Sequence, residues 1–226
     1  MNKKADSSEN VVKLKQGSSA DAPARHKGIY LLPNLLTTGA LFAGFYAVLS
    51  GFTGQFELAA IAIFAAMIFD GLDGRVARMT NTQSDFGVQY DSLSDMVSFG
   101  VAPAVVAYGW GVSDLGKLGL AAAFVYASCA ALRLARFNVQ AESSDGKVFT
   151  GLPSPAAAAL VAGFVWSTYE LAPSVALSVL GAVLTAAAGL LMVSNFKYPS
   201  FKEVDLRGKV PFIVILSVVM GFVVIT

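Results

Sequence analysis

The sequence predicts an all-α protein that crosses a lipid bilayer as a bundle of transmembrane helices. Of its 226 residues, 55% are hydrophobic and only 14% are charged, whereas a soluble domain carries about 25% charged residues. The mean hydropathy is +0.63. Apolar runs of about 20 residues, the length that crosses a bilayer as a helix, recur along the chain. We therefore expect lipid, not water, to surround most of its surface.

The apolar runs define the expected elements in order. Residues 1–27 are polar and rich in Ser, Ala and Lys, so we expect a disordered or surface-lying cytoplasmic tail and not a cleaved signal peptide. The transmembrane domain then occupies residues 28–226. Its expected spans are 29–51, 56–79, 87–111, 116–138, 153–172, 174–196 and 209–226. The first six would form the helical core, followed by at least one further C-terminal span.

The basic residues predict the orientation of these spans. All but one of the 16 Lys and Arg residues fall in the tail or in connections on the same side of the membrane, and only Lys117 falls on the other. Cytoplasmic loops carry such an excess of positive charge. We expect an integral protein of the cytoplasmic (inner) membrane, with the N-terminus and the acidic segment on the cytoplasmic side. Trp110, Trp166 and Tyr169 lie near the opposite ends of their spans, where interfacial aromatic residues are common.

Charge and rare residues exclude several classes of function. A net charge of +1 argues against nucleic acid as a partner. The only cysteine, Cys129, lies in an apolar run, so there is neither a disulfide framework nor a cysteine metal site. The only histidine, His26, lies in the polar tail, which removes most histidine-based catalysis and zinc chemistry.

An acidic segment between two apolar spans is the strongest functional signal. Residues 70–95 hold five of the 15 acidic residues. Asp70 and Asp73 are spaced i, i+3, and Asp91 and Asp95 i, i+4, so each pair shares a helix face. If neighbouring antiparallel spans bring the pairs together at the cytoplasmic mouth, the carboxylates repel one another unless a hard cation such as Mg²⁺ or Mn²⁺ joins them. A solvated acidic loop is the alternative, but ionisable residues that continue into apolar helix usually have a function.

The other residues of this segment suit a phosphate group. Gly71 and Gly74 remove side chains where a helix can approach a ligand. Arg78 lies about two turns beyond Asp70 and offers a planar fork for phosphate. Gly87 leaves bare backbone at the start of the next span. Metal ligands, an arginine and exposed backbone together favour a pyrophosphate.

Asp70-Gly-Leu-Asp-Gly-Arg-Val-Ala-Arg, then eight residues, Gly87, three residues, Asp91, three residues and Asp95 resembles the full signature of the CDP-alcohol phosphatidyltransferase family. The resemblance implies a membrane enzyme, often a homodimer, that uses two divalent ions, Mg²⁺ or Mn²⁺, on a CDP-linked lipid. It implies Asp70, Asp73, Asp91 and Asp95 as metal ligands, with Asp95 also the general base.

The resemblance also implies contacts with the CDP-lipid. "PNLLTTG", from Pro33 to Gly39, is similar to the family's Asn-x-x-Thr element. Its alternative interpretation is a helix start whose threonine is satisfied by its own helix. The expected contacts are Asn34, Thr37, Gly71, Gly74, Ala77, Arg78, Ser84 and Gly87.

Three further stretches concern the acceptor alcohol. "SFGVAPA", "RLARFN" and "TGLPSPAAA" resemble the membrane-embedded branch of the family that acts on L-serine, which implies conversion of CDP-diacylglycerol and serine into phosphatidylserine and CMP. The single histidine excludes the soluble serine transferases, which need paired His-Lys motifs. Candidate acceptor contacts are Arg133, Arg136, Asn138 and Ser94. Each arginine has an alternative interpretation as a membrane anchor.

Other functions stay open at this point. Within the family, the runner-up is a phosphatidylglycerophosphate synthase, whose basic residues would bind glycerol phosphate. A membrane prenyltransferase also uses aspartates and Mg²⁺, but its aspartate pairs lie far apart in sequence. A divalent-cation transporter would carry carboxylates nearer mid-span and on several helices.

Overall fold

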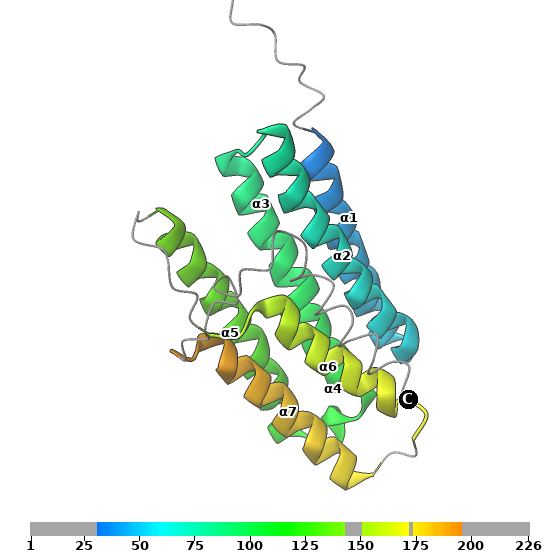
Figure 1. Ribbon diagram of the computed structural model, residues 1–226. Helices are drawn as coiled ribbons and strands as arrows, with labels where there is room; N and C mark the ends of the chain where they lie inside the picture. Colours follow the sequence, from blue (N-terminus) through cyan, green and yellow to red (C-terminus); the bar gives the residue numbers. More distant parts are fainter. Residues whose placement is uncertain (1–30, 143–150, 172–173, 196–226) are drawn as a thin grey trace, which may run out of the picture.

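The computed structural model describes residues 31–142, 151–171 and 174–195, and every regular element in these ranges is a helix (Figure 1). The tail and the expected span at 209–226 lie outside the described residues. The helices are α1 (Leu31–Phe52), α2 (Phe56–Thr80), α3 (Asp85–Asp95), the π-helical η1 (Met96–Val101), α4 (Ala102–Trp110), the 3₁₀-helical η2 (Val112–Leu115), α5 (Lys117–Glu142), α6 (Ser154–Thr168) and α7 (Val175–Val193).

The helices form two pairs, with α3, η1, α4 and α6 packed between them. Figure 1 shows α1 and α2 side by side along one edge of the bundle and α5 beside α7 along the other, and both pairs are in extensive contact. The rod formed by α3, η1 and α4 contacts α1, while α6 packs against α2, α4 and α7. The turn η1 contacts α1, α5 and α6, so helices far apart along the chain meet around the residues that follow Asp95.

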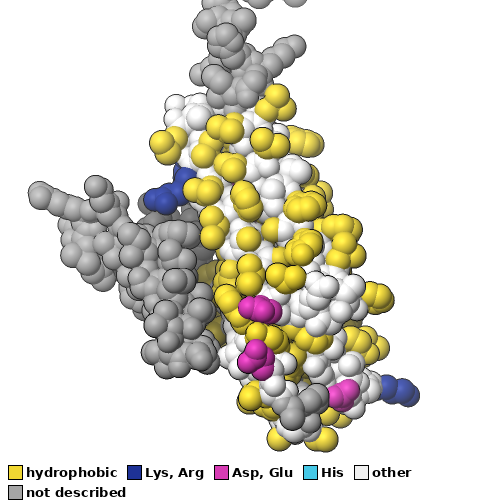
Figure 2. Space-filling model, turned by 90° about the vertical axis from the view of Figure 1, so that its right-hand side faces the viewer, with side chains coloured by type: hydrophobic (Ala, Val, Ile, Leu, Met, Phe, Trp, Pro, Cys, Tyr) yellow, Lys and Arg dark blue, Asp and Glu magenta, His cyan; other side chains and the backbone are white. Residues whose placement is uncertain are grey.

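Within the described part of the chain, three helices are long and apolar enough to cross a membrane: Leu31–Phe52, Lys117–Gln140 and Val175–Val193. Ser154–Thr168 is a shorter apolar helix. Although α2 has 25 residues, its second half carries Asp70, Asp73, Arg75 and Arg78, which lowers its hydropathy. Large hydrophobic side chains such as Phe42, Phe45 and Leu49 are exposed, and Figure 2 shows hydrophobic side chains spread over the described part of one face. The protein is therefore a membrane protein.

The third expected span, 87–111, contains an irregularity that the sequence analysis missed. The structure divides it into α3, the π-helical turn η1 and α4. Pro103 has no N–H group to donate to the carbonyl of Phe99, one turn earlier. The buried hydroxyl of Tyr126, from α5, donates to that carbonyl instead, at 2.9 Å. A side chain from α5, distant in sequence, thus supplies a hydrogen-bond donor to a carbonyl of the π-helical turn. This turn begins directly after Asp95.

Small residues let the helices approach closely. A Cβ atom on Gly44 of α1 would lie 2.7 Å from the Cα atom of Ser98, and one on Gly189 of α7 would lie 2.7 Å from the Cα atom of Tyr126. Both distances are shorter than real Cβ contacts allow. The buried core is accordingly rich in alanine, as is typical where membrane helices pack closely.

Candidate active site

Three aspartates from two helices meet at one point. One carboxylate oxygen each of Asp70 on α2 and of Asp91 and Asp95 on α3 lie within 4.8 Å of one another. The carboxyl groups of Asp70 and Asp95 interact directly with each other. The expectation that the two spans bring their carboxylates together is therefore confirmed for these three residues.

The turn between α2 and α3 brings Asp70 close to Asp91 and Asp95. Asn81 ends α2 in the left-handed conformation, with φ 52°, and its N–H group bonds to the last carbonyls of the helix. Ser84 begins α3, and its hydroxyl accepts a hydrogen bond of 3.1 Å from the N–H group of Gly87. Asp70 lies about three helical turns before Asn81, and Asp95 lies about three turns after Ser84. Both aspartates therefore lie at the same height in the two antiparallel helices.

Asp73 is held apart from the other three carboxylates. It is only 5% exposed, and its Oδ2 atom accepts a hydrogen bond of 2.6 Å from the hydroxyl of Thr37 on α1. Its charge nevertheless acts on both Asp70 and Asp91. Four carboxylates thus share one region, three of them in direct reach of a common point.

Two buried serines fix α3 and η1 against α1. Ser94 donates a hydrogen bond of 3.2 Å to the carbonyl of Thr37, and Ser98 donates one of 3.0 Å to the carbonyl of Ala40. Because α3 contacts α1 more extensively than it contacts α2, the carboxylates of α2 and α3 lie opposite each other without tight backbone packing between them.

The donor set fits a hard divalent cation. Within the described residues, Oδ1 of Asp91 is buried and has no hydrogen-bond partner. Leaving a buried carboxylate oxygen unpaired is costly. A cation between Asp70, Asp91 and Asp95 would satisfy this oxygen and offset the repulsion between the charges. Oxygen ligands of this kind are those that Mg²⁺ and Mn²⁺ prefer.

The residues expected to contact the CDP-lipid lie on α1, α2 and the start of α3. A Cβ atom on Gly87 would lie 3.2 Å from the Ser84 hydroxyl and 3.7 Å from Oδ1 of Asn34, so these three residues are neighbours. The guanidinium of Arg78 lies close to Gly74, at 3.7 Å from an added Cβ atom. Gly71 and Ala77 are partly buried on α2. Their contacts with a nucleotide stay predictions.

The four candidate acceptor contacts differ in their surroundings. Nη1 of Arg133 donates a hydrogen bond of 2.8 Å to the hydroxyl of Ser154, and the guanidinium interacts electrostatically with Asp95. Arg136, one turn further along α5, has no hydrogen-bond or ion-pair partner among the described residues. The Asn138 side chain pairs with Ser92. Only Arg133 of these residues is shown interacting with the aspartates.

The remaining candidate, Ser94, is 1% exposed and uses its hydroxyl on the carbonyl of Thr37. Its contact with an acceptor stays a prediction.

Comparison with known proteins places this site in a family. The sequence profile described as CDP-alcohol phosphatidyltransferase matches residues 30–194. The chain belongs to the CDP-alcohol phosphatidyltransferase family. The CDP-diacylglycerol–serine O-phosphatidyltransferase of Helicobacter pylori (strain J99) is 40% identical over 198 residues, which cover 86% of this chain and 83% of the relative. The enzyme of the same name from Bacillus subtilis is 35% identical over 172 residues, or 76% of this chain and 92% of the relative.

A solved structure shares the fold. The phosphatidylinositol phosphate synthase of Mycobacterium tuberculosis, crystallised with CDP-DAG bound, superposes with a TM-score of 0.54 over 73% of this chain and 82% of the other. Its sequence identity is 20%, so the likeness concerns the fold alone. The arrangement of helices described above thus also occurs in that protein.

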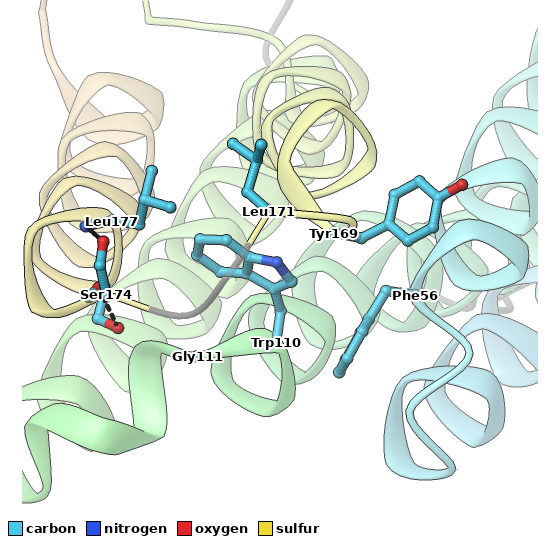
Figure 3. Close-up of a pocket in the computed structure, with 8 residues that line it drawn as sticks. Phe56, Trp110, Gly111, Tyr169, Leu171, Ser174 and Leu177 are labelled. Atoms are coloured by element: carbon cyan, nitrogen blue, oxygen red, sulfur yellow. Dashed lines mark hydrogen bonds between the residues drawn. The ribbon is translucent and has the colours of Figure 1, made fainter.

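A small cavity lies far from the family's signature residues. It has a volume of about 130 Å³ and is lined by Phe56, Trp110, Tyr169 and neighbouring residues (Figure 3). Phe56 begins α2, and Asp70 lies about four turns further on, or about 21 Å along the axis. Trp110 and Tyr169 suit a position at the membrane–water interface. The cavity therefore belongs to the other end of the bundle.

The sequence did not reveal the hydrogen-bond partner of Arg133. Ser154, the partner of Arg133, lies in the "TGLPSPAAA" stretch, which the sequence analysis used only as a resemblance. The sequence places a serine between two prolines at the start of a span, which draws attention to Ser154 but does not predict that Arg133 is its partner. The contact became visible only when α5 and α6 were placed together.

Proposed function

We propose that the protein transfers the phosphatidyl group of CDP-diacylglycerol to the hydroxyl of L-serine, giving phosphatidylserine and CMP. The observation that carries this proposal is the convergence of Asp70, Asp91 and Asp95 on one point, with the Arg133 guanidinium near enough to act electrostatically on Asp95. A guanidinium suits the carboxylate of serine, and a free carboxylate suits the proton of its hydroxyl. The names of the relatives from H. pylori and B. subtilis, which cover most of the chain, support the same acceptor.

The four aspartates of the signature would hold two divalent ions, Mg²⁺ or Mn²⁺. Asp70, Asp91 and Asp95 already lie close enough to share a cation, and Asp73 contributes its charge from the side of α1. When bound, such cations neutralise the pyrophosphate and stabilise the departing CMP. The ligand set beyond these three residues is part of the proposal.

The protein's own residues then carry the transfer. Asp95 accepts the proton of the serine hydroxyl, and the serine oxygen attacks the phosphorus that bears the diacylglycerol. We propose that CMP leaves in the same step, since among the described residues no cysteine or histidine lies in the aspartate cluster to form a covalent intermediate. Positioning and charge neutralisation supply most of the rate enhancement in reactions of this kind.

The nucleotide would lie between α1, α2 and the start of α3. Gly71, Gly74 and Gly87 leave the backbone accessible, and Ala77 adds only a methyl group. Arg78 would bind a phosphate, with Ser84 and the N–H groups at the start of α3 as further donors. Asn34 and Thr37 would complete the site from α1. The closeness of Asn34, Ser84 and Gly87 supports a shared ligand.

The membrane topology is also a proposal. The distribution of Lys and Arg supports a cytoplasmic N-terminus and an active site that opens to the cytoplasm, in the inner membrane. We propose six spans in the catalytic core, with α2 and the α3–α4 rod crossing the bilayer as well. A homodimer is expected by resemblance to the family.

An acceptor panel tests the activity. Purified protein in detergent, with CDP-diacylglycerol and Mn²⁺ or Mg²⁺, should release CMP with L-serine and form phosphatidylserine. Chelation of the cation should abolish the reaction, and the unrelated alcohol glycerol should give only background release. Faster turnover with glycerol 3-phosphate than with serine would overturn the proposal in favour of a phosphatidylglycerophosphate synthase.

A further inference from the structure

One arginine, Arg133, is hydrogen-bonded to α6 and interacts electrostatically with the aspartate cluster. Ser154, the first residue of α6, is 0% exposed. Its hydroxyl accepts the 2.8 Å hydrogen bond from Nη1 of Arg133. The same guanidinium interacts with Asp95, the proposed general base. Residues from α6, α5 and α3 are thereby connected in that order.

The backbone before Ser154 is held firmly in place. Gly151 adopts the left-handed conformation, with φ +87°, and a Cβ atom there would collide with the carbonyl of Met192 and lie 3.1 Å from that of Ser194. The N–H group of Leu152 donates a hydrogen bond of 3.0 Å to the carbonyl of Leu191. The segment is therefore fixed to the end of α7, and prolines on both sides of Ser154 restrict its backbone further.

This fixed serine acts on one of the two arginines at this end of α5. Arg133 carries five N–H donors in a rigid fork, and Ser154 engages one of its terminal nitrogens. Arg136, at i+3, has no such partner among the described residues. An arginine held in one orientation loses less conformational entropy when it binds a carboxylate.

We propose that Ser154 is a positioning residue that determines acceptor specificity, by holding Arg133 so that its remaining donors face the acceptor's carboxylate beside Asp95. This inference rests on the proposed function, since it takes the acceptor to be serine. The inference assigns a role to the Gly151–Ser154 segment: it orients Arg133 from α6, whereas Asp95 lies on α3. It also selects Arg133 over Arg136 as the arginine that binds the acceptor.

Steady-state kinetics of Ser154→Ala in the full chain test the inference. The serine KM should rise roughly 10-fold, the scale of losing a hydrogen bond to a charged group, while the KM for CDP-diacylglycerol stays unchanged. Ser154→Thr keeps the hydroxyl and should restore most of the affinity for serine. Ser178→Ala is the matched control, because Ser178 is also a buried helical serine, 3% exposed, but lies on α7 near the other end of the bundle.

A double variant separates positioning from packing. If Ser154 acts through Arg133, adding Ser154→Ala to Arg133→Lys should change the serine KM little beyond the effect of Arg133→Lys alone. An equal rise of both KM values, or a full additional rise in the Arg133→Lys background, would mean that Ser154 only packs, and the inference would be wrong. An unchanged serine KM in Ser154→Ala would also overturn it while leaving the proposed function intact. Wild-type protein that does not use serine would overturn both.

Discussion

The hydroxyl of Thr37 on α1 donates a hydrogen bond of 2.6 Å to Oδ2 of Asp73 on α2. The same hydroxyl lies 3.1 Å from the carbonyl of Pro33 in its own helix, so both interpretations of the "PNLLTTG" stretch have a physical basis. The contact with Asp73 means that α1 does more than pack against α2. It holds one carboxylate of the signature in a fixed orientation beside the other three.

Thr37→Val should therefore weaken metal binding. The substitution keeps the shape of the side chain but removes the donor to Asp73, and a hydrogen bond to a charged group contributes roughly 1.5–3 kcal/mol. We expect the Mn²⁺ concentration for half-maximal activity to rise about 10-fold, and calorimetric Mn²⁺ binding to weaken in parallel. Thr37→Ser should behave as wild type.

Thr38→Val is the control for this experiment. Thr38 is the next residue of α1, and its hydroxyl bonds to Asn34 and Tyr90, not to an aspartate. Thr38→Val should leave the Mn²⁺ concentration for half-maximal activity unchanged. An unaltered half-saturation in Thr37→Val would show that Asp73 needs no partner on α1.

Asp95→Asn should abolish turnover while CDP-lipid binding persists. The amide cannot accept the proton of the acceptor hydroxyl, and general-base catalysis contributes about 10²- to 10⁴-fold. CMP release measures the loss, and binding of CDP-diacylglycerol by the variant checks that the site survives. Asp85→Asn, an exposed acidic residue at the start of α3 and outside the signature, should keep near-normal CMP release. Robust release by Asp95→Asn would exclude it as the base.

The helices and the aspartate cluster were largely predictable from the sequence, and the cross-helix contacts were not. Apolar runs located α1, α2 and α5 to within a few residues because lipid selects hydrophobic segments of fixed length. Helical spacing predicted that Asp70 would face Asp91 and Asp95. The π-helical turn after Asp95 depends on Pro103 together with Tyr126 from another helix, so local pattern could not show it.

The hydrogen bonds that orient the site residues were likewise not predictable from the sequence. The bonds of Thr37 to Asp73 and of Ser154 to Arg133 join residues distant in sequence. Each depends on how two helices pack, which a single sequence does not specify. Small residues at the packing positions are visible in the sequence, but their partners are not.

Gly44→Ala should destabilise the protein and lower its activity. The added Cβ atom would lie 2.7 Å from the Cα atom of Ser98, so α1 and η1 would have to separate. Overpacking of this kind costs about 1–3 kcal/mol. Gly163→Ala in α6 is the control, since a Cβ atom there meets nothing within 4 Å and alanine favours helix. Thermal unfolding in detergent should rank Gly44→Ala below wild type and Gly163→Ala at or above it.

Thr185→Val should raise stability without changing activity. Thr185 lies in α7 and is 1% exposed, and within the described residues its hydroxyl has no hydrogen-bond partner. An unsatisfied buried hydroxyl costs about 1–3 kcal/mol, and valine has nearly the same shape and the same branching at Cβ. We expect a higher unfolding temperature with unchanged kcat, because α7 carries none of the proposed site residues.

Thr168→Val is the control for the unfolding temperature of Thr185→Val. Thr168 is also buried, but its hydroxyl donates a hydrogen bond of 2.6 Å to the carbonyl of Phe164. Removing it loses a bond, so stability should stay level or fall. If Thr185→Val lowered the unfolding temperature as well, the Thr185 hydroxyl would have to be bonded in the folded protein, and a water molecule or another part of the chain would be its partner. A gain confined to Thr185→Val would show that α7 carries an unpaired hydroxyl in its packed interface.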